Sequence, residues 1–65
     1  MKKLDLHGVR HSEVERLVEN FVLLNEPPLD IVTGHSDKMP KLVIEVLDRH
    51  NIQWEQWDNA TIKIL

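Results

Sequence analysis

Apolar positions along the first half of the chain follow two different spacings, which predict a strand and then a helix. Over residues 2–7 apolar and polar residues alternate, as in a strand with one buried face. Over residues 13–24 apolar residues recur every three or four positions, as on one face of a helix. Ser12 and Glu15 have the spacing of a capping box, so Ser12 is predicted to cap this helix. The double proline at 27–28 then ends it.

The same alternation of strand and helix is repeated in the next part of the chain. Residues 29–33 are mostly apolar and β-branched and are followed by Gly34, which predicts a second strand. A second helix follows, with Ser36 or Asp37 as its cap and Asn51 at its end. Its apolar stripe consists of Met39, Leu42, Val43, Val46 and Leu47.

A hairpin is predicted to close the chain. Residues 52–57 and 60–65 are two strand-like runs separated by a two-residue turn. Trp54 and Trp57 have opposite phases in the first run, so one is expected in the core and the other at the surface. The order βαβαββ, with a single apolar stripe on each helix, predicts one α/β domain over residues 1–65. We expect a two-layer sandwich with both helices on one face of a four-stranded mixed sheet.

The composition narrows the classes of function. The 65 residues include eight Lys and Arg against eleven Asp and Glu, a formal net charge of -3 at pH 7, and no cysteine. The lack of cysteine excludes disulfides, thiolate metal sites and a thiol nucleophile. No apolar run has the length of a membrane span and no secretion signal is recognisable, so a cytoplasmic location without membrane contact is expected. Because acidic residues outnumber basic ones, any nucleic acid is expected to bind locally and weakly.

Two polar clusters are predicted to meet at one edge of the sheet. A strand, a crossover helix and a second strand form a parallel pair, whose carboxyl ends share an edge that commonly binds ligands. The first cluster contains Asp5, His7, Gly8 and Arg10, and the second contains Gly34, His35, Ser36 and Lys38. Helix N-termini attract anions, and an imidazole titrates near neutral pH. Together these groups predict a site that binds a phosphodiester and assists its hydrolysis.

Two of these segments resemble motifs of a known family. Residues 4–8, Leu-Asp-Leu-His-Gly, resemble the amino-terminal signature of the Smr (small MutS-related) domain, and residues 32–35, Val-Thr-Gly-His, resemble its second motif. The resemblance extends over nearly the whole chain. It implies a βαβαββ two-layer fold similar to the C-terminal domain of translation initiation factor 3, with nucleic-acid binding and nicking or RNA-cleaving endonuclease activity. It also implies a catalytic role for Asp5 and His7 and a binding role for Gly34 and His35.

Departures from the family pattern favour a second interpretation. Ser36 stands where the family usually has a second glycine, and residues 58–59 replace the glycines that commonly precede the last strand. The chain is also shorter than typical members and lacks a basic excess. It therefore resembles a short, divergent member. The alternative is a non-catalytic interaction module or homodimer that keeps the Smr scaffold without nuclease activity.

The hydrolytic interpretation assigns a role to each candidate. Asp5 or His7 would position or deprotonate the attacking hydroxyl, and His35 would supply a proton or a contact. With the RNA 2′-hydroxyl as nucleophile no cofactor is expected and DNA should resist cleavage. A metal site from Asp5, His7, His11 and His35 is the less favoured alternative, because the chain has no tight ligand spacing. Trp57 would either stack on a nucleobase or cover a protein surface, including a homodimer contact.

Overall fold

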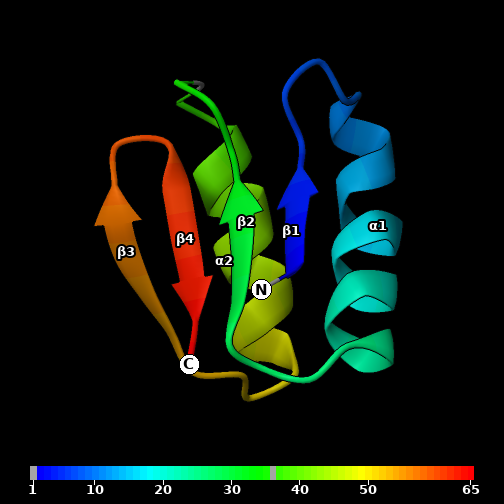
Figure 1. The fold of residues 1–65 in the computed structure, drawn as a ribbon. Helices are drawn as coiled ribbons and strands as arrows, with labels where there is room; N and C mark the ends of the chain where they lie inside the picture. Colours follow the sequence, from blue (N-terminus) through cyan, green and yellow to red (C-terminus); the bar gives the residue numbers. More distant parts are fainter. Residues whose placement is uncertain (1, 36) are drawn as a thin grey trace.

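The elements of the fold follow one another in the predicted order. The computed structural model describes residues 2–35 and 37–65, and Figure 1 shows the chain as a ribbon. Its elements are β1 (Lys2–Asp5), α1 (His11–Leu24), β2 (Leu29–Val32), α2 (Met39–Arg49), β3 (Trp54–Asp58) and β4 (Thr61–Ile64). The βαβαββ order is thereby confirmed. Within the described ranges, neither helix has the length and apolar character needed to cross a membrane.

The four strands form one mixed sheet in the order β1-β2-β4-β3. β1 and β2 are parallel, whereas β4 is antiparallel to both of its neighbours, β2 and β3. As a result β1, β2 and β3 all point toward the same edge of the sheet, at the top of Figure 1. β2 and β4 are the central strands, and β1 and β3 are the edges.

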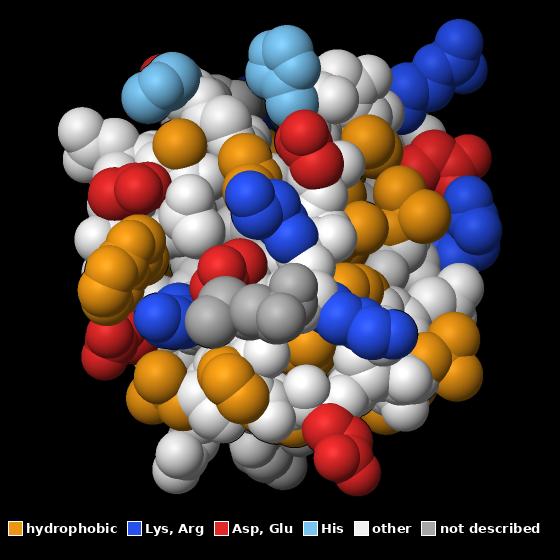
Figure 2. All heavy atoms as spheres, viewed as in Figure 1, with side chains coloured by type: hydrophobic (Ala, Val, Ile, Leu, Met, Phe, Trp, Pro, Cys, Tyr) orange, Lys and Arg blue, Asp and Glu red, His pale blue; other side chains and the backbone are white. Residues whose placement is uncertain are grey.

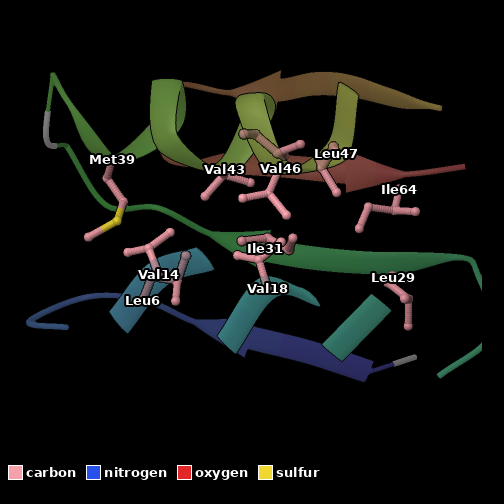
Figure 3. Packing of buried hydrophobic residues seen from close by; sticks show 11 residues of the cluster. Leu6, Val14, Val18, Leu29, Ile31, Met39, Val43, Val46, Leu47 and Ile64 are labelled. Carbon is pink, nitrogen blue, oxygen red and sulfur yellow. The ribbon is translucent and has the colours of Figure 1, made fainter. Parts of the chain in front are cut away.

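Both helices cover the same face of the sheet, as predicted. Side chains from α1 and from α2 converge on Ile31 of β2 in Figure 3. The buried apolar side chains are Leu6, Val14, Val18, Leu29, Ile31, Met39, Val43, Val46, Leu47, Ile62 and Ile64. Each fully buried aliphatic side chain contributes about 1.5–3 kcal/mol relative to an exposed one. The other face of the sheet carries no helix, so the domain has two layers.

The first helix begins two residues earlier than predicted, and the predicted capping box is wrong. Arg10, in an extended conformation, is the N-cap residue, and it makes no side-chain cap bond. Ser12 and Glu15 both lie inside the helix. Glu15 instead accepts a hydrogen bond from Arg49 of α2 at 2.7 Å. A tertiary contact with a residue 34 positions away has therefore prevailed over the local signal.

The start of the second helix also differs from the prediction. Lys38, rather than Asp37, occupies the N-cap position, and Pro40 lies in the first turn, where a missing N–H is tolerated. The other predicted cap, Ser36, lies outside the described residues.

The end of the second helix is a Schellman motif built on asparagine. The N–H of Asn51 donates to the carbonyl oxygen of Asp48 at 3.1 Å, and the N–H of Ile52 donates to that of Leu47 at 2.9 Å. Asn51 has a φ of 57°, the left-handed conformation that this motif requires. Ile52 is partly buried against the core. The predicted stop at Asn51 is therefore confirmed.

Replacing Asn51 by alanine should lower the free energy of unfolding by about 1 kcal/mol, because a Cβ-bearing residue other than asparagine is strained at positive φ. Asn51→Gly should be neutral or stabilising. Asn20→Ala on the exposed side of α1 is the matched control and should not destabilise the fold. Urea unfolding followed by circular dichroism measures all three. Equal effects at positions 51 and 20 would contradict the role of the left-handed cap.

Candidate functional site

The two loops that follow β1 and β2 meet at one edge of the sheet. β1 and β2 pair with Asp5 opposite Val32, and the N–H of Leu6 extends the pairing with a 2.8 Å bond to the carbonyl oxygen of Val32. His7 therefore leaves the sheet beside Gly34. A Cβ placed on Gly34 would lie 3.6 Å from Cδ2 of His7, so the imidazole lies on the side of Gly34 from which a side chain would project. The prediction that the two loops lie at one edge of the sheet is confirmed, and within them His7 and Gly34 are neighbours.

The loop after β1 is a compact turn held by Asp5. The carboxylate oxygen Oδ1 of Asp5 accepts a 2.9 Å hydrogen bond from the main-chain N–H of His7. Gly8 follows with a φ of 79°, and the N–H of Val9 closes the turn on the carbonyl oxygen of Leu6 at 3.0 Å. An Asp side chain that binds the main chain two residues later is an Asx turn. Asp5 therefore positions His7 through the main chain.

The loop after β2 is anchored by a buried threonine. Thr33 is 2% exposed, and its hydroxyl lies 3.1 Å from the carbonyl oxygen of Ala60 and 3.2 Å from that of Gly34. The main-chain N–H groups of Thr33 and Gly34 both donate to the oxygen of Ala60, at 2.7 and 3.3 Å. This internal bond occupies the Gly34 N–H, which the sequence reasoning had assigned to phosphate. The φ of 72° at Gly34 still favours glycine at that position.

A third segment, the turn between β3 and β4, therefore belongs to this edge. Asp58 accepts a 2.8 Å bond from the N–H of Ala60 through Oδ1, a second Asx turn. Gln56 steadies the same turn by donating to the carbonyl oxygen of Thr61 at 3.1 Å. The sequence reasoning assigned no site role to this turn. The strand order decides this placement: because β4, the second strand of the hairpin, pairs antiparallel with β2, the hairpin turns at the edge where β2 ends.

Helix ends and basic side chains at this edge attract an anion, although the exposed carboxylates of Asp5, Asp37 and Asp58 lie at the same edge. Both helices begin here, and the partial positive charge of a helix lies at its N-terminus. Arg10 and Lys38 occupy the two N-cap positions, and both are exposed. His7 and His35 are exposed as well. Histidine side chains stand along the upper rim of Figure 2, above the ends of β1 and β2.

One sequence-derived candidate, Trp57, lies apart from this group. Trp57 is 61% exposed and lies at a bulge of β3, which β4 separates from β2. Two strand spacings of about 4.8 Å place it roughly 10 Å from the Gly34 loop. Nζ of Lys63 lies 4.2 Å from the centroid of its ring. Ser36, a further sequence-derived candidate, lies outside the described residues.

The alternative of a metal centre finds no support in the geometry. Over residues 2–35 and 37–65, no three His, Asp or Glu side chains gather closely enough to hold a metal ion. His11 is the first residue of α1 and lines a small groove between the two helices. It thus faces different neighbours from those of His7.

The groove between the helices contains an ionic clamp that the sequence reasoning missed. The guanidinium of Arg49 binds Glu15 at 2.7 Å and Glu45 at 3.2 Å. The hydrogen bond and charge of Glu15 raise the pKa of Arg49 above its ordinary value, so this residue stays charged at any physiological pH. His50 lies 3.6 Å from Glu19 across the same interface. These contacts join α1 to α2 and leave little free charge there for a ligand.

Comparisons with protein-family models, curated proteins and solved structures give no match to this chain.

Proposed function

We propose that this chain is an Smr-like domain that binds the phosphate backbone of nucleic acid, RNA in particular, at the edge formed by the loops after β1 and β2. The position of His7 beside Gly34 carries the proposal, because it brings the two motif-bearing loops together at one edge. Arg10 and Lys38 flank that surface at the two helix N-termini. The resemblance of residues 4–8 and 32–35 to the Smr motifs supports the same assignment.

Charge on the remaining surface restricts a polyanion to this edge. The uncovered sheet face has two lysines, Lys3 and Lys63, against four carboxylates from Asp5, Asp30, Glu55 and Asp58. The carboxylates repel a phosphate backbone, and salt screens the remaining attraction to the lysines. We therefore expect the domain to bind RNA weakly and through only a few of its basic side chains. For the same reason Trp57, on the acidic face, is a weaker candidate for base stacking than its exposure alone suggests.

The same surface supports a metal-independent cleavage of RNA. The imidazole of His7 would accept the proton of a ribose 2′-hydroxyl while that oxygen attacks the adjacent phosphorus. The bond from phosphorus to the 5′-oxygen would break, and His35 would donate the proton that the leaving oxygen needs. The products are a 2′,3′-cyclic phosphate and a 5′-hydroxyl. Asp5 serves this step by holding the backbone of His7.

Removing the two flanking cations should weaken RNA binding. Arg10→Gln and Lys38→Gln together should lower the affinity for a labelled single-stranded RNA about tenfold and reduce the slope of log K against log salt by about one to two. Fluorescence anisotropy at several salt concentrations measures both. The matched control is Lys2→Gln, which removes a charge at the opposite end of β1. Unchanged affinity in the double variant, or an equal loss in the control, would refute binding at this edge.

A second candidate function is a non-catalytic interaction module on the same scaffold. Two observations favour it: Asp5 and Asp58 both bind turn amides, and the Gly34 N–H is bonded to Ala60. These groups already have structural roles. The absence of both RNA cleavage and salt-dependent RNA binding would support a protein-interaction module, whereas cleavage that requires His7 would exclude it.

A further inference from the structure

The uncovered face of the sheet has a regular charge pattern across all four strands. Lys3 of β1 is paired in register with Asp30 of β2, Asp30 with Lys63 of β4, and Lys63 with Glu55 of β3. Asp30 and Lys63 alternate with the buried positions of β2 and β4, and Lys3 and Glu55 are in register with them, so all four side chains lie on the face away from the helices. They form one row with the signs plus, minus, plus, minus. Figure 2 views this face, where cationic and anionic side chains are intermixed.

These charges are not paired with one another inside the molecule. In the described part of the chain, the ion pairs within 4.0 Å involve helix residues and the helix-capping His50, and none includes a member of the row. Lys63 leans over the ring of Trp57 instead. The four charged groups therefore keep their capacity for an external partner.

We propose that two copies of this chain associate face to face through this row, about a two-fold axis that runs parallel to the strands between β2 and β4. Such an axis reverses the order of the row in the second copy. Lys3 then faces Glu55 of the second copy, and Asp30 faces its Lys63. Each contact occurs twice, so all four charges of each subunit meet an opposite charge. An in-plane axis perpendicular to the strands would place like charges opposite each other, so the pattern selects a single geometry.

Apolar side chains beside the row complete this surface. Trp57 is 61% exposed and would lie over β1 of the second copy, because β3 and β1 are exchanged by the axis. Leu65 is 54% exposed and continues the alternation of β4 on the uncovered side. Four large apolar side chains are exposed among the described residues, and two of them, Trp57 and Leu65, lie on this face. The other two are Leu23 and Leu24 of α1. The interface therefore contains both apolar area and matched charge.

The size of the face predicts a weak dimer. Four strands spaced by about 4.8 Å and about five residues in length cover roughly 300 Å² per subunit. A standard stable interface buries about 800 Å² per partner, so this dimer should form only at about 0.1–1 mM protein. The loop edge that carries His7 stays outside the interface. Dimer formation can therefore be tested independently of nucleic-acid binding.

Charge reversal with heterodimer rescue tests the geometry. Lys3→Glu places like charges opposite each other twice in a dimer, as does Glu55→Lys, and each variant alone should associate at least about tenfold more weakly than the parent. An equimolar mixture of the two restores every opposite-charge contact. Sedimentation velocity at up to about 1 mM protein should show the mixture within about threefold of the parent affinity. The matched controls Lys41→Glu and Glu26→Lys make the same changes off this face and should leave self-association unaltered.

Two further readouts do not depend on the variants. Parent self-association should weaken in 0.5 M salt, at which the Debye length is only about 4 Å. Trp57 fluorescence should shift to shorter wavelength as the protein concentration rises. A parent that is monomeric at about 1 mM overturns the proposal, because a dimer of this area should be visible there. A folded mixture that associates no better than its components, or controls that weaken association equally, would overturn it as well.

Discussion

Leu47→Ala is expected to lower the free energy of unfolding by about 3–4 kcal/mol, the largest effect on stability predicted for this chain. Leu47 is 0% exposed and lies on the buried stripe of α2. Truncation removes buried apolar surface and leaves a cavity that the surrounding side chains fill only in part. A domain of this size has few kilocalories to lose, because it buries only about 60% of the surface of its unfolded chain. We therefore expect much of the variant to be unfolded at 25 °C.

The matched control for this loss is Leu24→Ala. Leu24 is also a helical leucine, but it is 80% exposed at the last position of α1. Its truncation should change the free energy of unfolding by no more than about 0.5 kcal/mol. Thermal and urea unfolding of both variants, followed by far-ultraviolet circular dichroism, makes the comparison. Similar losses at the two positions would show that the buried side of α2 is not the core described above.

His7→Ala is expected to reduce RNA cleavage by about 10²–10⁴-fold, the largest effect on activity. Its ring lies beside Gly34, where the two loops meet, and in the proposed reaction it removes the proton of the attacking hydroxyl. A labelled RNA and its DNA counterpart, incubated with the parent and the variant, provide the measurement. The RNA product should end in a 2′,3′-cyclic phosphate, and the DNA should remain intact.

His11→Ala is the control for that loss. This histidine is exposed, close in sequence to His7, and lies in the groove between the helices rather than at the loop edge. It should leave the rate of cleavage unchanged. An equal loss in both variants, or cleavage of DNA at the same rate, would contradict the assigned role of His7. If the parent binds RNA without cleaving it, the proposed RNA binding is retained and the catalytic role of His7 is rejected.

The order of elements and the two layers were determined by local spacing in the sequence. Alternation in β2 buries Leu29 and Ile31, and the helical spacing in α2 buries Val43, Val46 and Leu47. A parallel crossover between two such strands has one favoured hand and brings both loops to one edge. The meeting of His7 with Gly34 therefore required no knowledge of distant contacts.

Only the tertiary structure decided which partner each polar group has and which strands are neighbours. Glu15 binds Arg49, 34 positions away, instead of capping its own helix, and Thr33 binds Ala60, 27 positions away. The strand order inserts β4 between β2 and β3, and this alone aligns Lys63 with Asp30. Hydrophobic periodicity specifies which face of an element is buried, but it carries little information about which distant polar group will lie within hydrogen-bond distance of a given side chain. Those partners depend on how the packed elements lie against one another, which becomes definite only when the whole core has formed.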